Sequence, residues 1–229
     1  IVVQKTSYFH GIMTNERFGK IVSVGEIVPG PLTRSQEIDF DTLFFDGNRL
    51  KSIDESEASN HLGGSILAIT SDDFLVYQRQ GQGNEIEPSA LAAAGSGSFD
   101  WRDYEQNPKQ TLRELIVRSL ERELAEELTV DVGPDKSTTA VLGFYRYFQR
   151  GGKIEFGAIT KLRNSRHEIK VNPRDCGFTR EVKFLHLPKM APGVIGKELN
   201  DFCKDMFQSP QASYSFKMTL FLYLKYLER

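Results

Sequence analysis

The clearest periodic pattern in this chain of 229 residues runs from Asn107 to Leu128. Asn107 and Pro108 are typical of a helix start, with asparagine as the cap and proline in the first turn. Apolar residues and one serine then recur at steps of three and four, which places them on one helix face. They are Leu112, Leu115, Ile116, Ser119, Leu120, Leu124 and Leu128. We therefore predict one helix, about 31 Å long by the usual rise per residue, that packs on a core along this face.

Two pairs of apolar runs, each joined by a short polar turn, predict β-hairpins on either side of this helix. The predicted strands are Ser65–Thr70, Phe74–Arg79, Ala140–Gln149, Lys153–Leu162 and Glu181–Leu187, and two later helices are Glu198–Phe207 and Phe216–Leu227. Because strands and helices alternate without regular βαβ spacing, the pattern favours an α/β (α+β) fold in which a mixed sheet lies between helices.

Residues 1–60 carry only short apolar runs, separated by turn residues such as Pro29-Gly30-Pro31 and Asp46-Gly47-Asn48. We predict a small β-rich extension over residues 1–60 and a main domain over residues 61–229. The extension could form a homodimer interface, cover a substrate or cap a sheet edge.

Composition narrows the classes of function. The formal net charge is −2, so the chain lacks the excess of lysine and arginine that a general nucleic-acid binder needs. A small phosphate ligand is compatible with this charge. Cys176 and Cys203 do not make a disulfide framework in so long a chain. No apolar run approaches the ~18 residues of a membrane span, and we expect a cytoplasmic protein that does not bind membranes.

The helix ends in a dense group of acidic residues. Glu123 lies three residues before Glu126 and four before Glu127, so their Cβ atoms are about 5–6 Å apart on one face. With Glu121 and the single cation Arg122, this stretch has a local charge of −3. Such carboxylates repel one another unless a cation is bound. Mg²⁺ suits them, because it takes oxygen ligands and shares its remaining positions with substrate phosphates.

This segment resembles the signature of the Nudix hydrolases, G-x5-E-x7-R-E-U-x-E-E-x-G-U, in which U is a bulky aliphatic residue. The matching residues are Glu114, Arg122, Glu123, Leu124, Glu126, Glu127 and Val130, with the spacings intact. Pro108 and Thr129 stand where the two signature glycines are expected. We expect Gly95-Ser96-Gly97-Ser98 to supply the glycine turn instead, with Gly95 and Gly97 beside the substrate and Phe99–Asn107 as a longer loop. The resemblance covers about residues 63–187.

The resemblance implies hydrolysis of a nucleoside diphosphate linked to another moiety, with Mg²⁺ or Mn²⁺ as cofactor. Glu123 and Glu127 correspond to metal ligands, and Glu126 to a third ligand or to the group that orients the attacking water. Arg122 is placed to pair with Glu126 four residues later. Glu114 belongs to the supporting shell in the family.

The general base and the phosphate contacts are less well defined by the sequence. Glu155 and Glu181 are candidate bases, although glutamates on strands are commonly only surface residues. Arg146 and Arg150 could bind substrate phosphates, although exposed cations on a hairpin are ordinary.

Two other functions remain open. A binding module could keep this fold after losing turnover. An isopentenyl diphosphate isomerase would need a cysteine facing the metal site, and both cysteines lie well after the helix. The sequence does not identify the substrate among nucleotide sugars, ADP-ribose, nucleoside triphosphates and coenzyme diphosphates.

Overall fold

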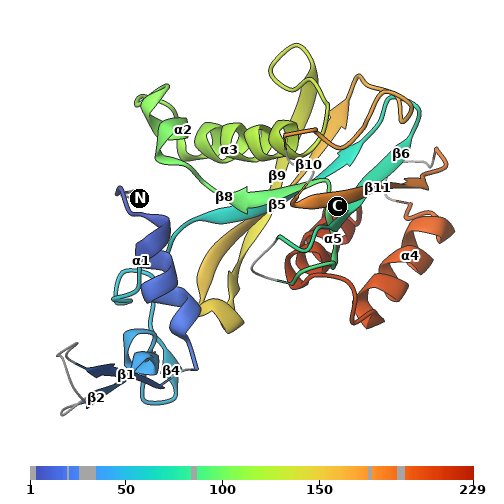
Figure 1. Ribbon diagram of the computed structural model, residues 1–229. Coiled ribbons are helices and arrows are strands. Elements are labelled where there is room, and N and C mark those ends of the chain that lie inside the picture. Colours follow the sequence, from blue (N-terminus) through green and yellow to red (C-terminus); the bar gives the residue numbers. More distant parts are fainter. Residues whose placement is uncertain (1–3, 20, 26–34, 84–86, 175–176, 190–193) are drawn as a thin grey trace. The chain divides into compact units, whose positions relative to one another are not determined.

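The computed structural model describes residues 4–19, 21–25, 35–83, 87–174, 177–189 and 194–229 (Figure 1). The chain divides into two compact units. The N-terminal unit comprises Ile1–Leu62 and Arg146–Ile154, and the sheet unit comprises Gly63–Tyr145 and Glu155–Arg229. Within the described segments, every helix is too short or too polar to cross a membrane.

The sheet unit is built on one mixed sheet of seven strands, which are β5 (Gly63–Ile69), β6 (Phe74–Gln80), β7 (Leu91–Ala93), β8 (Gly95–Ser98), β9 (Ser137–Tyr147), β10 (Lys153–Leu162) and β11 (Thr179–His186). Five of them lie in the order β11-β6-β5-β10-β9, while β7 pairs with β6 and β8 with β5. β5 and β10 are parallel, whereas β6 is antiparallel to β5, β7 and β11.

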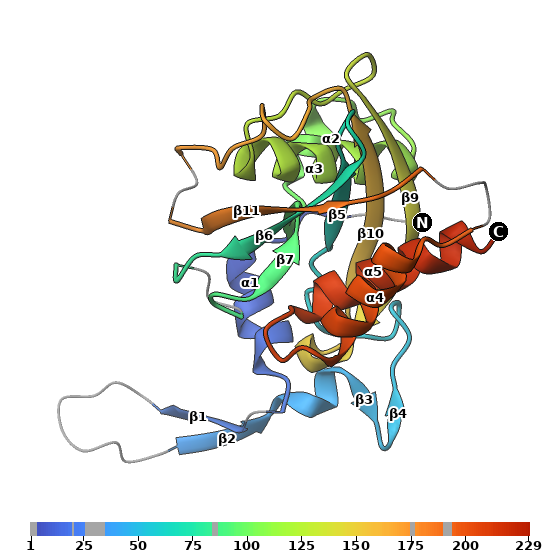
Figure 2. The same ribbon diagram turned by 90° about the vertical axis from the view of Figure 1, so that its right-hand side faces the viewer.

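Helices cover both faces of this sheet, as Figure 1 and Figure 2 show. α2 (Trp101–Glu105) and α3 (Leu112–Glu127) lie on one face, and α4 (Lys197–Gln208) and α5 (Tyr214–Leu227) lie on the other. Phe216 and Leu220 of α5 are fully buried in one apolar cluster with Leu67 of β5 and Leu75 of β6. The predicted fold class, a mixed sheet between helices, is confirmed.

The predicted start of the long helix was wrong. α3 begins at Leu112 and not at Pro108, because Thr111 caps it: the Thr111 hydroxyl accepts a hydrogen bond from Glu114 N, and the Glu114 carboxylate accepts one from Thr111 N. This reciprocal pair is a capping box. Trp101–Glu105, expected to be loop, forms a separate short helix with its own capping box from Asp100 and Asp103. α3 itself is about 24 Å long.

The predicted glycine turn at residues 95–98 is also corrected. These residues form β8, which pairs antiparallel with β5 and places Ser96 opposite Ser65. The glycines serve close packing: a Cβ at Gly95 would lie 2.7 Å from the Cα of Leu124 on α3. Glycine here allows the helix backbone to approach the strand.

The remaining elements follow the predicted pattern. β10 spans the predicted Lys153–Leu162, and the other predicted strands and the two C-terminal helices agree to within three residues at each end. β5 and β10 are buried along almost their whole length, as expected for strands covered by helices on both faces.

The N-terminal unit contains a short helix, α1 (Tyr8–Met13), and two antiparallel hairpins, β1 (Ile21–Gly25) with β2 (Ser35–Asp39) and β3 (Phe45–Asp46) with β4 (Arg49–Leu50). It also contains the tip of the β9–β10 hairpin, where Gly151 and Gly152 have φ of 58° and 70°. Phe18 and Phe45 pack against Phe148 of this tip, with ring centroids 5.7 Å and 5.6 Å away.

Candidate active site

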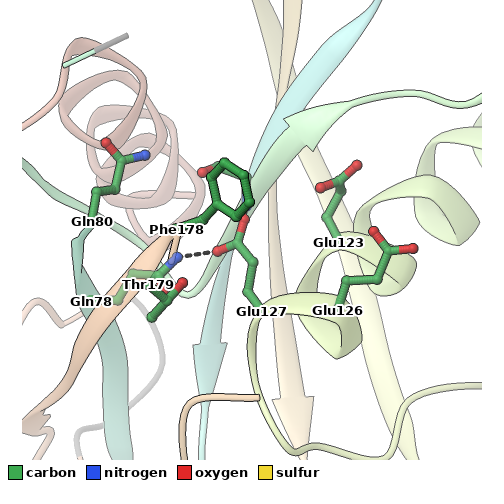
Figure 3. A pocket seen from close by; sticks show the side chains of 8 residues that line it. Gln78, Gln80, Glu123, Glu126, Glu127, Phe178 and Thr179 are labelled. Carbon is green, nitrogen blue, oxygen red and sulfur yellow. Dashed lines mark hydrogen bonds between the residues drawn. The ribbon is translucent and has the colours of Figure 1, made fainter. Parts of the chain in front are cut away.

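A cavity of about 190 Å³ opens between α3, β6, β8 and the start of β11 in the sheet unit. Eight residues line it: Gln78, Gln80, Ser96, Glu123, Glu126, Glu127, Phe178 and Thr179. Figure 3 shows the three glutamates coming from one stretch of α3, with Gln78 and Gln80 across from them on β6. The structure thus brings together in one pocket the three glutamates that the sequence predicted as metal ligands.

Glu127 is the glutamate that reaches toward the sheet. Its Oε1 accepts a hydrogen bond from the backbone N–H of Ser96 at 3.0 Å. Its Oε2 accepts one from the side-chain amide of Gln78 (Figure 3). Because a carboxylate only accepts hydrogen bonds, the NH₂ group of Gln78 must face it. The opposite Oε1 of Gln78 is buried and accepts no hydrogen bond from the described residues.

Arg122 joins the other two glutamates. Its Nη1 donates to Glu126 at 2.8 Å, as the four-residue spacing predicted, and its Nη2 lies 2.9 Å from Glu123 Oε1. Its Nε donates to Asp103 of α2 at 3.0 Å, and Nη2 donates to the same carboxylate at 3.1 Å. Nη2 also donates to the carbonyl oxygen of Ser98 at 3.2 Å. The guanidinium is therefore fixed from α2, α3 and β8 together.

Glu123 is more enclosed in the pocket than Glu126. Its side chain is 13% exposed, compared with 56% for Glu126. Burial raises the pKa of Glu123 to about 7, and the neighbouring charge of Glu126 also raises it, while Arg122 lowers it. A negative charge on Glu123 is therefore costly unless a further cation compensates it.

The donor set is suited to Mg²⁺, because carboxylates supply the hard oxygen ligands that this ion prefers. Gly97 on β8 leaves room for the carboxylate of Glu123, which a Cβ at that position would overlap. As the side chains lie, no three acidic, histidine or cysteine residues of the described part of the chain form a group that could hold a metal ion. Arg122 contacts Oε1 of Glu123 and Oε2 of Glu126, so a bound cation would be held by the other oxygen of each carboxylate.

Changing Gly97 to alanine is expected to disturb the site while leaving the fold intact. The added Cβ would displace the end of the Glu123 side chain, which is flexible, and not the backbone of α3. We expect Mn²⁺ affinity, measured by electron paramagnetic resonance, to fall about 10–100-fold, as for lost supporting contacts in metal sites. The melting temperature should not fall, because alanine restricts the unfolded chain. G177A is the control, since a Cβ at Gly177 meets no atom within 4 Å. Equal Mn²⁺ affinity in both variants would contradict the prediction.

Other predicted site residues lie elsewhere. Glu155 is buried on β10. Gly157, two residues later, faces α5, because a Cβ there would lie 2.7 Å from Leu222 of that helix. Alternation along the strand directs Glu155 to the same face, away from α3 and the pocket. Glu181, on β11, is exposed and pairs with Lys183 at 3.0 Å.

Glu114 does not line the cavity, because its carboxylate is used at the start of α3 with Thr111. Arg146 and Arg150 belong to the N-terminal unit, where Arg146 Nη1 donates to the carbonyl oxygen of Lys51 at 2.6 Å and Arg150 Nε donates to Glu16 at 2.6 Å. Within the described residues, Cys203 gives no support to isomerase chemistry at this pocket. Cys203 is buried in the apolar cluster at α4, and burial raises its pKa to about 12. Cys176 lies outside the described residues.

Sequence reasoning missed several residues that build the pocket. Gln78 is fully buried in the middle of β6, and a polar residue inside a predicted apolar strand was a usable signal. Phe178 lines the pocket while 53% exposed. Asp103 gave no signal, because its partner Arg122 is distant in sequence.

Fold and site together define a mixed α/β protein with an acidic pocket supported by an arginine. The sequence matches no protein-family model, and no curated protein matches it. Among solved structures, a bifunctional NMN adenylyltransferase/ADP ribose pyrophosphatase from Francisella tularensis, complexed with AMP and a manganese ion, is 16% identical with a TM-score of 0.47. That match covers 73% of this chain and 42% of the Francisella chain, so it spans less than half of that protein.

Two shorter proteins are matched over nearly their whole length. A MutT protein from Methanosarcina mazei Go1 is 9% identical with a TM-score of 0.46, over 74% of this chain and 96% of that chain. A MutT Nudix hydrolase from Burkholderia pseudomallei is 12% identical with a TM-score of 0.42, over 71% and 96%. The structural neighbours thus include Nudix hydrolases at low identity. Since these TM-scores are below 0.5, we infer the activity of this chain from its own residues.

Proposed function

We propose that this chain is a Nudix-type pyrophosphohydrolase, which uses Mg²⁺ or Mn²⁺ to hydrolyse a nucleoside diphosphate linked to another moiety. The observation that carries the proposal is the convergence of Glu123, Glu126 and Glu127 on one cavity. They also stand in the order and spacing of the signature, next to an arginine that contacts two of them.

The charge balance of the pocket supports a bound cation. When all four are ionised, Asp103 and the three glutamates carry four negative charges, and Arg122 is the one cation that contacts Asp103, Glu123 and Glu126 in the described structure. Carboxylates in a partly buried pocket repel one another strongly, since the local dielectric constant is lower than that of water. A divalent cation together with a diphosphate would balance this charge.

The proposed reaction is substitution at phosphorus by water. The water oxygen forms a bond to phosphorus, the bridging P–O bond breaks with its electron pair on the leaving phosphate, and the water proton passes to a base or to solvent. When bound, Mg²⁺ would polarise the phosphoryl oxygen and lower the pKa of a bound water.

The position of each residue in the pocket indicates its role in the proposed reaction. Glu123 and Glu127 hold the cation, since both are less exposed than Glu126. Glu126 is the most exposed of the three and is placed to orient water or accept its proton. Arg122 fixes the orientation of Glu126. The proposal includes a cytoplasmic setting.

A binding module without turnover is the second candidate. It is favoured by one observation: in the described structure the three carboxylates are paired with Arg122, Gln78 and Ser96, and no three acidic residues are grouped for a metal. Such a module would bind a nucleotide without releasing phosphate-containing products.

A screen of substrates separates the two candidates. The purified chain is incubated with ADP-ribose, nucleotide sugars, nucleoside triphosphates and coenzyme diphosphates, each with Mg²⁺, Mn²⁺ or EDTA. We expect hydrolysis of at least one class with metal and none with EDTA. In ¹⁸O-labelled water, the label should appear on a phosphate of one product. Binding of a nucleotide without any product formation would favour the binding module and overturn the hydrolase.

A further inference from the structure

Asp103 is a buried acid outside the glutamate helix. It lies in α2, in the segment that separates β8 from α3, and its side chain is only 1% exposed. Buried aspartates are rare unless they are paired, because removing a carboxylate from water is costly. Its partner is Arg122, which contacts the pocket glutamates.

The contact between the two side chains is bidentate. Both Nε and Nη2 of Arg122 donate to the Asp103 carboxylate, at 3.0 Å and 3.1 Å. This geometry fixes the plane of the guanidinium as well as its position. The remaining donors then reach Glu126 at 2.8 Å and Glu123 at 2.9 Å.

Asp103 is itself held firmly by its own helix. Its Oδ2 accepts a hydrogen bond from the backbone N–H of Asp100 at 3.2 Å, which is one half of the capping box of α2. Its carbonyl oxygen accepts a hydrogen bond from the side chain of Gln110 at 2.8 Å. A short helix thus presents one fixed carboxylate to Arg122.

We infer that Asp103 is a positioning residue, which holds Arg122 so that Glu123 and Glu126 keep the orientation needed to bind the cation. The inference rests on the proposed function. Without Asp103, the plane of the guanidinium would no longer be fixed, and its Nε and Nη2 donors could also take the remaining oxygens of the two glutamates in competition with the metal. The resemblance to the signature assigns a supporting place to Glu114, which is instead used at the start of α3.

The test compares D103N and D103E with D100A. D103N keeps the size of the side chain but loses the charge and one acceptor toward Arg122. D103E restores a carboxylate. D100A is the matched control, because it removes the side-chain cap of α2 and the ion pair with Arg102 and leaves the contacts of Arg122 in place.

Two measurements need no turnover. The first is Mn²⁺ affinity by electron paramagnetic resonance, which should weaken about 10–100-fold in D103N, recover at least in part in D103E and stay at the wild-type value in D100A. The second is hydrogen exchange of the Arg122 Nε–H group by NMR, with the signal assigned from R122K. Exchange should be slow in the wild type and D100A and faster in D103N. Where turnover is found, kcat should fall in D103N with little change in KM for the nucleotide.

The outcomes distinguish the inference from the proposed function. Wild-type Mn²⁺ affinity in D103N overturns the positioning role and leaves the hydrolase proposal intact. Equal losses in D103N and D100A also overturn it, because Asp103 would then only hold α2 together. If the wild type binds no Mn²⁺, the proposed function and the inference both fall.

Discussion

Changing Glu127 to glutamine is expected to lower kcat on the order of 10³-fold or more, because losing a charged metal ligand removes several kcal/mol of transition-state stabilisation. The measurement is steady-state turnover at saturating Mg²⁺ with the substrate found in the screen. A fall in kcat with unchanged KM would place the loss in the chemical step.

The fold should tolerate this substitution. Glu127 accepts from Ser96 N and from the Gln78 amide, and the Oε1 of Gln78 is buried without a hydrogen bond from the described residues. In E127Q the new amide oxygen can still accept from Ser96. The Gln78 amide can turn over, so that its oxygen accepts from the new NH₂ group. The free energy of unfolding should therefore stay close to that of the wild type.

E121Q is the control on the same helix. Glu121 accepts hydrogen bonds from the hydroxyls of Ser137 and Thr139 outside the pocket, at 2.9 Å and 2.6 Å. These hydroxyls can reorient toward an amide. Full activity in E121Q with loss in E127Q is expected. An active E127Q enzyme would remove Glu127 from the proposed metal site.

The second large effect concerns stability. The metal-free protein should lose stability as the pH rises from about 4.5 to above 7, and E123Q should lose less. Burial raises the pKa of Glu123 from 4.5 to about 7. A carboxyl group with a higher pKa in the folded chain holds its proton more tightly when folded. Its stabilising contribution is complete below pH 4.5 and is lost as the pH rises through 7, which corresponds to about 3 kcal/mol.

Urea unfolding in EDTA at pH 5 and pH 8 measures this difference. All other groups titrate in both proteins, so the comparison with E123Q isolates Glu123. At pH 8, E123Q should be the more stable protein by up to about 3 kcal/mol, because an amide carries no buried charge. Excess Mg²⁺ should then stabilise the wild type and have little effect on E123Q. The same pH dependence in both proteins would contradict the assigned environment of Glu123.

Sequence alone predicted those parts of the fold and of the site in which the local pattern agrees with the packing. The apolar steps from Leu112 to Leu124 predicted the buried face of α3, and the spacing of Glu123, Glu126 and Glu127 predicted their meeting in one pocket. The pairing of Arg122 with Glu126 also follows from helix geometry. All of these relations join residues within a few helical turns.

The features that the sequence did not predict depend on contacts between segments that are distant in the chain. Asn107-Pro108 is a good start signal, but Thr111 with Glu114 provides a better cap once Trp101–Glu105 folds separately. The glycines of β8 allow this strand to lie close to α3. In the sequence alone, the same glycines are equally typical of a turn. The face of β10 on which Glu155 lies is set by the packing of α5.

The hairpin formed by β9 and β10 contributes residues to both compact units of the chain. Its stem belongs to the sheet unit, while its tip shares a compact unit with residues before Gly63. Asn15 donates to the carbonyl oxygen of Arg150, and Glu16 pairs with its side chain. A shortened polypeptide starting at Gly63 would keep Arg150 and Phe148 and lose these neighbours. Removal of residues before Gly63 would therefore leave the hairpin loop without the side chains that it contacts in the intact chain.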